Sequence, residues 1–271
     1  MNKLIVLSVI VLMASGCKNK TFEYTTLGDY TPYNRYPEKI TGKIKKLVEN
    51  NYWATPNGET FVKGNKITIR DRDSLSWTND FTALFDIKGR LMSCTLVDEN
   101  DRPISRWELS GYDNNQTIAK YFKDDTVRSY RKLKFDEKGN LEEILQYRPG
   151  SDTLLSRCSV KASLKSDTIE LWWYTNKDVP TAKHFFMWDG NGQFLRTEAY
   201  DHEGVFRAAV EAKYNDKMKV SELIFSDRDK KIIREYYFTY EYDGKGNWTK
   251  ALVKNQQGKA IIEERTYSYF E

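Results

Sequence analysis

The sequence predicts an all-β protein whose strands form an antiparallel β-meander of repeated hairpins. An aromatic-Asp-x-x-Gly motif recurs along the chain, its flanks alternate between apolar and polar residues, and no sustained helical period spans the region. Roughly 14 strands are expected, more than the ten or so that an open sheet usually contains before it curls. We therefore expect a long, twisted, curled sheet in the form of a trough or partial barrel.

The motif is clearest in four copies, which begin at Phe85, Phe135, Trp188 and Tyr242. Weaker copies begin at Tyr112 and Tyr214, so the leading aromatic residues follow one another at steps of 27, 23, 53, 26 and 28. The step of 53 is about twice the others and indicates a degenerate copy near Val160 to Asp167. A unit of about 26 residues has room for two strands and two turns.

The motif has the chemistry of a tight hairpin turn. Asp at the first turn position accepts hydrogen bonds from backbone N–H groups further along the turn, and Gly at the fourth supplies a positive φ before a bulge. These positions are interpreted as structural turn residues and not as calcium ligands, because no closing Glu completes a calcium loop. They are Asp86, Gly89, Asp136, Gly139, Asp189, Gly192, Asp243 and Gly246.

An additional hairpin is expected ahead of the repeats. Residues 39–53 fit a helical spacing through Ile40, Ile44, Leu47 and Val48, yet the same segment can also open a strand. We favour the strand, because Asn57-Gly58 is typical of a hairpin turn and residues 61–70 look like its partner.

The first residues have the order of a signal peptide: Lys3, an apolar run from Leu4 to Met13, and then small residues. The run of about ten residues is too short for a membrane-spanning helix, which needs roughly 20. Ala14-Ser15-Gly16-Cys17 resembles the lipobox of bacterial lipoproteins, although Ala14 stands where leucine is usual. That resemblance implies a signal peptide over 1–16 and a lipidated Cys17; an ordinary secretory peptide is the alternative.

The segment after the cysteine predicts location and organisation. Residues 17–36 lack an apolar period and are interpreted as a lipidated tether, which leaves 37–271 as one repeat domain. Lys18-Asn19-Lys20 lacks the aspartate that retains many lipoproteins in the inner membrane. The lipoprotein resemblance therefore implies a cell-envelope protein anchored in the membrane through Cys17, on the periplasmic face of the outer membrane.

The repeats resemble those of the YD-repeat, or RHS-like, lipoproteins of Gram-negative bacteria. The resemblance covers roughly Pro37 to Glu271, depends on the aromatic-Asp-x-x-Gly turns, and is strongest at Tyr242 to Lys250. It implies a β-hairpin repeat architecture and says little about function, although the large RHS toxins use such repeats as an encapsulating shell.

Composition and motifs argue against several classes of function. The 43 Lys and Arg against 39 Asp and Glu are spread along the chain without a basic patch, so nucleic acid is not an expected partner. His184 and His202 are the only histidines, and no zinc-ligand spacing or Gly-x-Ser-x-Gly elbow occurs. We expect no metal, no cofactor and no enzyme, although an active site assembled from distant residues stays open.

Two cysteines follow Cys17, at Cys94 and Cys158, in units of the repeat that are not neighbours. Strands lie about 4.8 Å apart, while bridged Cα atoms lie within roughly 7 Å. The spacing therefore predicts two unpaired, mostly buried thiols, unless a strongly rolled sheet brings them together.

The tryptophans are the best candidates for binding. Seven occur, about one per unit, so most are expected to fill the apolar face of their hairpins. Trp172 and Trp173 are neighbours, which places one on each face of a strand. With Tyr174, Trp188 and Trp248 they form the candidate binding surface. We expect a protein partner bound through the curved sheet; the alternative is a glycan or peptidoglycan stacked on exposed rings.

Overall fold

The computed structural model describes residues 24–26, 39–68, 71, 80–112, 115–137, 141–163, 168–189 and 193–271. The predicted all-β class and antiparallel meander are confirmed. The strands are β1 (Tyr24–Thr26), β2 (Lys39–Thr41), β3 (Ile44–Asn57), β4 (Thr60–Lys66), β5 (Asp80–Phe85), β6 (Leu91–Val97), β7 (Pro103–Ser110), β8 (Gln116–Lys123), β9 (Thr126–Phe135), β10 (Leu141–Tyr147), β11 (Leu154–Ser163), β12 (Thr168–Thr175), β13 (Pro180–Trp188), β14 (Phe194–Asp201), β15 (Phe206–Tyr214), β16 (Val220–Ser226), β17 (Ile232–Tyr242), β18 (Trp248–Asn255) and β19 (Ala260–Tyr269).

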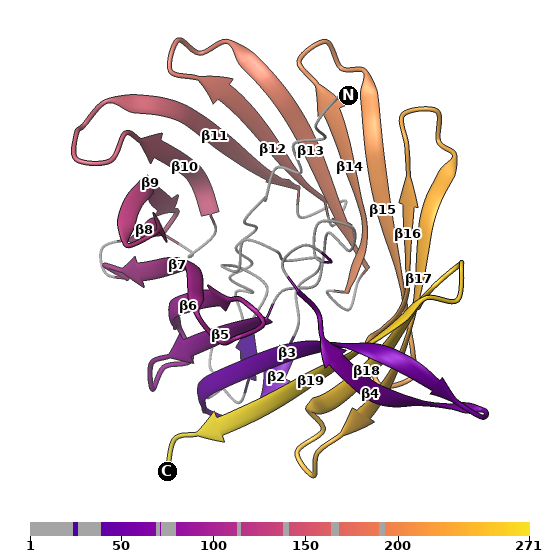
Figure 1. The fold of residues 1–271 in the computed structure, drawn as a ribbon. Coiled ribbons are helices and arrows are strands. Elements are labelled where there is room, and N and C mark those ends of the chain that lie inside the picture. Colours follow the sequence, from indigo (N-terminus) through magenta and orange to yellow (C-terminus); the bar gives the residue numbers. More distant parts are fainter. Residues whose placement is uncertain are drawn as a thin grey trace.

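The sheet closes into a complete barrel, where a trough or partial barrel was predicted. β3 pairs with β19 along one edge and with β5 along the other, which completes a wall of 16 strands made of β3 and β5 to β19 (Figure 1). The ambiguous segment 39–53 is therefore strand, and it is the strand that closes the barrel. Its partners in β19 lie more than 200 residues away in the sequence, beyond the reach of any local pattern.

β4 is an additional strand beside the wall. It pairs with the second half of β3, from Tyr52 to Asn57, whereas β5 pairs with the first half, from Lys46 to Glu49. The turn at Gly58, with φ of +61°, is the hairpin expected from Asn57-Gly58. The edge of β3 therefore changes partner between Glu49 and Tyr52.

The hairpin turns share one hydrogen-bonding scheme. At Asp86, the carbonyl accepts from the N–H of Gly89 at 2.9 Å, and Oδ1 accepts from the N–H groups of Lys88 and Arg90. Asp243 makes the same contacts with its own turn, and Asp189 Oδ1 accepts from the N–H of Gln193 at 2.8 Å. Gly139 and Gly192 lie outside the described residues, as does the turn of the degenerate copy at 164–167.

All the motif turns lie at one end of the barrel. Consecutive connections of an antiparallel meander alternate between its two ends, and the four clear motifs occupy every fourth connection: β5–β6, β9–β10, β13–β14 and β17–β18. We call this end the motif rim. The chain also enters β3 and leaves β19 there, where the N–H of Phe270 donates to the carbonyl of Lys43 at 2.9 Å. Each unit thus returns the chain to the rim from which it started.

Tyrosine hydroxyls stabilise the first residues of strands that leave the motif rim. Tyr214 donates to the carbonyl of Phe194 at 2.7 Å, and Tyr240 donates to that of Val220 at 2.8 Å. Each carbonyl lies beside a bulge, where the regular ladder is interrupted. Equivalent bonds link Tyr112 to Leu91 and Tyr267 to Trp248. The aromatic residues of the repeat therefore satisfy backbone groups as well as filling space.

Candidate functional site

The register of the strands assigns every side chain to the inside or the outside of the barrel. Leu47, Ala83, Cys94 and Trp107 pair in sequence across β3, β5, β6 and β7, so their side chains share one face. All four are buried, and this inner face contains most of the hydrophobic core around the whole wall. The inside of the barrel is therefore predominantly apolar.

The outer face has the opposite character. Opposite charges stand directly across from each other on neighbouring strands, and their ion pairs are short: Lys134–Glu143 at 2.8 Å, Lys213–Glu222 at 2.7 Å and Lys250–Glu241 at 2.7 Å. A barrel embedded in lipid presents an apolar band outward and polar residues inward. The polarity of this wall is therefore the inverse of that pattern.

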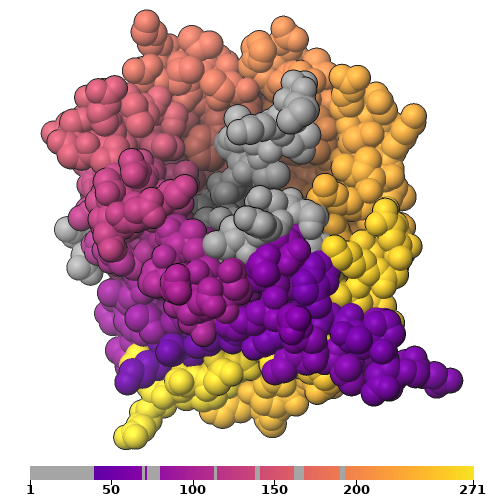
Figure 2. Space-filling view, in the orientation of Figure 1, coloured from indigo at the N-terminus to yellow at the C-terminus, as the bar shows by residue number. Residues whose placement is uncertain are grey.

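With 16 strands, the wall encloses a wider interior than a small barrel does. Barrels of about eight strands are filled by inward side chains, whereas those of 16 to 18 leave a lumen. The inner face of β13 to β15 accordingly keeps part of its surface accessible. Its half-buried residues there are Ala182, His184, Phe186, Thr197, Ala199, Ala208 and Val210. Small residues predominate at this place. Figure 2 shows the coloured strands arranged as a ring in this view.

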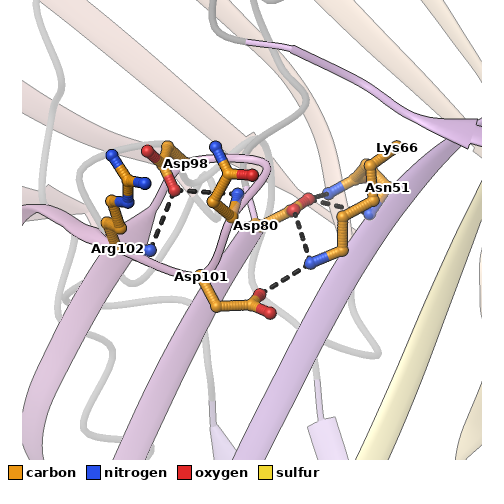
Figure 3. A network of polar contacts seen from close by, with 7 residues as sticks. Asn51, Lys66, Asp80, Asp98, Asp101 and Arg102 are labelled. Carbon is orange, nitrogen blue, oxygen red and sulfur yellow. Dashed lines mark hydrogen bonds and ion pairs between the residues drawn. The ribbon is translucent and has the colours of Figure 1, made fainter.

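A first polar group closes the gap where β3 changes partner. Asp80 is fully buried, and its Oδ1 accepts from the backbone N–H of Asn51 at 2.8 Å and from the Asn51 amide at 3.1 Å (Figure 3). Lys66 Nζ lies 3.7 Å from Asp80 Oδ2 and 2.6 Å from Asp101 Oδ1. The Asp80 carboxylate thus accepts the hydrogen bond that the Asn51 N–H would otherwise make to a neighbouring strand. Its role is therefore structural.

A second polar group lies across the closing pair of strands. Glu49 and Arg265 face each other in β3 and β19, both buried, with 2.8 Å between Glu49 Oε2 and Arg265 Nε. The Arg265 guanidinium also lies 3.8 Å from the centre of the Trp248 ring. Because the two charges neutralise each other, we interpret the pair as stabilising the closure of the barrel and not as a binding group for a ligand.

A third group differs because its donors are unpartnered. Trp107 Nε1, Ser129 Oγ and Arg131 Nε are buried on the inner face of β7 and β9, and none finds a hydrogen-bond partner among the described residues. Trp107 pairs with Tyr121, which pairs with Ser129, and the Arg131 guanidinium lies 5.1 Å from the Trp107 ring centre. We call these three residues the donor cluster.

Burial shifts the pKa values of Arg131 and of the nearby Cys158 thiol. Desolvation lowers the pKa of Arg131 to about 10, so its side chain is still cationic at neutral pH. Desolvation also raises the pKa of the Cys158 thiol to about 12, while the nearby Arg131 charge acts in the opposite direction. Cys94 and Cys158 are free and buried, as predicted. The inner face is therefore a low-dielectric environment.

The structure divides the predicted binding residues between the two faces. Trp173, Trp188 and Trp248 are buried on the inner face, whereas Trp172 and Tyr174 point outward. The Trp172 indole donates to Glu170 at 3.0 Å on that outer face. The five residues therefore do not form one surface.

The donor cluster escaped prediction from the sequence. Ser129, Arg131, Leu133 and Phe135 share one face of β9 by their period of two, so a cation at an inward position was the available signal. Among the described residues no group of three His, Cys, Asp or Glu could hold a metal ion. Within the same part of the chain, no helix is long and apolar enough to span a membrane. Cys17, the predicted lipidation site, lies outside the described residues.

No protein-family model and no curated protein sequence matches this chain. Among solved structures, it is similar to a porin-like protein from Bacteroides uniformis, with a TM-score of 0.51, 11% identity, and coverage of 83% of this chain and 96% of the other. A porin-like protein from Bacteroides vulgatus gives a TM-score of 0.40, 10% identity, and coverage of 84% and 99%. A putative outer membrane lipoprotein-sorting protein domain from Vibrio parahaemolyticus gives 0.24, 12% identity, and coverage of 83% and 86%.

These comparisons correct the predicted family. The resemblance to YD-repeat, RHS-like lipoproteins is wrong, because the fold is shared with a porin-like barrel and no family model matches. The recurring aromatic-Asp-x-x-Gly turn misled the prediction, since the same turn chemistry suits any antiparallel hairpin. In fold, the chain is similar to a porin-like barrel protein.

Proposed function

We propose that the barrel binds a lipid-like molecule, whose apolar part lies against the inner face, and that it does so without catalysis. The observation that carries the proposal is the inverted polarity of the wall, with ion pairs outside and the hydrophobic core inside. An accessible apolar surface in a protein usually marks a binding site. The half-buried small residues of β14 and β15 offer such a surface inside the barrel.

The closed wall changes what kind of partner can reach the aromatic face. In an open trough that face would be available to a folded protein, whereas in a barrel it lies inside and fits an extended apolar chain. A lipid-modified protein could still be a partner through its acyl chain.

A glycan is less well supported, because stacking of a sugar requires a free ring face. Lys183 Nζ already lies 4.3 Å from the ring centre of Trp172, and the Arg157 guanidinium lies 4.4 Å from that of Tyr174.

The location proposed for this function is the cell envelope, with the chain anchored through a lipidated Cys17 after removal of residues 1–16. Residues 17–36 would then be the tether, and 37–271 the ligand-binding domain. An envelope protein of this kind would hold an insoluble molecule in an aqueous compartment. Replacement of Cys17 by Ala should release the protein from the membrane fraction, and an unchanged distribution would contradict the anchor.

The binding proposal is tested with an apolar fluorescent dye, phenylnaphthylamine, displaced by oleyl alcohol. Ala199 and Ala208 face each other across β14 and β15 on the inner face, so Ala199→Trp places an indole in the lumen. This substitution should weaken binding of both probes about tenfold or more, because the added ring occupies the ligand's space. The readouts are dye fluorescence and calorimetric titration.

The matched control adds the same side chain to the outside of the wall. Thr239 is exposed on the outer face of β17, so Thr239→Trp should leave binding unchanged. Circular dichroism and the urea midpoint establish that both variants are folded. Equal weakening by the two variants, or no saturable binding to the unsubstituted protein, would reject the lumen as the site.

A further inference from the structure

We propose that the donor cluster binds the anionic head group of an amphiphile, a carboxylate or a phosphate, while the apolar chain of that molecule follows the inner face. The inference rests on the proposed function for the chain and deepens it by assigning the head group. Trp107, Ser129 and Arg131 supply three kinds of donor: an indole N–H, a hydroxyl and a guanidinium. Together they match the acceptor oxygens of an anion.

The geometry places the three donors on β7 and β9, which β8 separates. Trp107 in β7 is opposite Tyr121 in β8, and Tyr121 is opposite Ser129 in β9. Arg131 lies two residues further along β9, on the same face, with its guanidinium 5.1 Å from the Trp107 ring centre. The Trp107 and Tyr121 rings are also 5.1 Å apart. The packed aromatic pair therefore forms an apolar side wall beside the cation.

Among the described residues, these donors have no acceptor. A buried donor without an acceptor costs about 1–3 kcal/mol, and nearly all such groups in native proteins are paired. Trp107 Nε1, Ser129 Oγ and Arg131 Nε have no partner among the described residues. In that part of the chain, the inward positions of β7 to β12 include no Asp or Glu, so no carboxylate neutralises Arg131 from the facing strands. Three unpaired donors in one place indicate a missing acceptor.

Arg265 provides an internal comparison. Both arginines lie on the inner face, yet Arg265 pairs with Glu49 at 2.8 Å, whereas Arg131 lies beside the Trp107 ring and the Cys158 thiol and forms no ion pair with a described residue. The barrel thus compensates a buried cation where the role is structural. A cation retained without compensation suits an external anion, because a ligand carboxylate would provide the missing charge.

The experiment compares three probes with the same oleyl chain: oleate, oleyl phosphate and oleyl alcohol. The protein is the predicted mature chain, residues 17–271, with Cys17→Ser so that no attached lipid competes. We expect the unsubstituted barrel to bind at least one anionic probe about tenfold or more tightly than the alcohol, the range of a charge-assisted hydrogen bond. Arg131→Met should abolish this preference and leave the affinity for oleyl alcohol unchanged.

Two controls separate the head-group site from other effects. Arg128 is an exposed arginine on the outer face of the same strand, so Arg128→Met should keep the full preference for the anions. Arg131→Met should also leave the urea midpoint equal or higher, because it removes an uncompensated buried charge. If Arg131→Met does not fold, Arg131→Gln gives the same test with a neutral polar side chain.

The outcomes distinguish this inference from the proposed function. Preference for oleate or for oleyl phosphate, lost on substitution of Arg131, supports the site and identifies its head group as carboxylate or phosphate. An anion preference that survives in Arg131→Met or Arg131→Gln overturns the head-group site even if the lumen binds all three probes. Absence of binding by oleyl alcohol and by the dye overturns the proposed function itself.

Discussion

At the scale of single residues, three polar groups of the barrel wall have a definable task. Asp80 replaces a backbone partner for Asn51, Glu49 compensates Arg265, and Arg131 is left for an external anion in our proposal. Because buried charges are expensive unless compensated, these positions should respond most strongly to substitution.

Asp80→Ala should destabilise the protein by about 2–4 kcal/mol, because it orphans the N–H of Asn51 and removes a buried charge beside Lys66. Asp80→Asn keeps an acceptor for that N–H and should cost less. Asp101→Ala removes only the exposed partner of Lys66 and should change stability by less than about 1 kcal/mol. Urea unfolding measures all three, and equal effects of the Asp80 and Asp101 truncations would contradict the assigned role.

His184 should make stability fall as the pH falls. Desolvation lowers its folded-state pKa to about 4, whereas the unfolded chain has a pKa near 6.5, so the unfolded state binds more protons between these values. The contribution of His184 to the free energy of unfolding is complete above pH 6.5 and decreases as the pH falls towards 4. His184→Gln should flatten this part of the profile, whereas His202→Gln, at an exposed turn, should not. Urea midpoints across the pH range provide the measurement.

At the scale of elements, many hairpins share the same turn geometry but have different residues at the turn position with positive φ. Gly89, Gly204, Gly246 and Gly258 occupy the fourth place of their turns, and Asp101, Asp178, Met218 and Lys230 occupy it in others. All of these residues have positive φ. Since a side chain there costs about 1–2 kcal/mol relative to ordinary backbone regions, the two groups of turns differ in local strain.

Opposite substitutions should therefore shift stability in opposite directions. Gly246 has φ of +81° with open space around it, so Gly246→Ala should cost about 1 kcal/mol through backbone strain alone. Lys230→Gly, at φ of +61°, should stabilise by about 0.5–1 kcal/mol. Thermal unfolding of both variants gives the comparison, and loss of stability in Lys230→Gly would show that its side chain outweighs the strain.

At the scale of the whole molecule, closure joins the two ends of the domain. The β3–β19 ladder runs from Ile44 to Trp53 on one strand and from Ile261 to Tyr269 on the other. The buried pair of Glu49 and Arg265 lies in the middle of that ladder. Breaking the pair should weaken the pairing of β3 with β19 and therefore the closure of the whole barrel. Without this pairing, both strands would have an exposed edge.

Arg265→Met should destabilise the barrel by about 3–5 kcal/mol, because it leaves Glu49 as a buried, uncompensated charge. The double variant Glu49→Leu with Arg265→Met removes both charges and should recover most of that loss. A double-mutant cycle by urea unfolding measures the coupling. Additive losses from the two substitutions would show that the pair does not act as a unit.

The features that depend on residues close together in the sequence could be predicted from it. The period of two and the Asp and Gly turn positions predicted strands, hairpins and the all-β class, and the spacing of units predicted unpaired thiols at Cys94 and Cys158. Closure could not be predicted, because it depends on pairing between residues more than 200 positions apart. The donor cluster required closure as well, since only a closed wall makes an inward Arg131 a buried cation.

The return of every unit to the motif rim has an evolutionary consequence. Because a unit adds two strands and ends where it began, tandem duplication or loss of a unit alters the circumference without exchanging the two mouths or displacing either terminus. The circumference of the barrel can therefore change by one unit at a time, while the residues of the turns stay the same. Descendants with more or fewer units would have a wider or narrower barrel, which would suit a larger or smaller ligand while the topology stays the same.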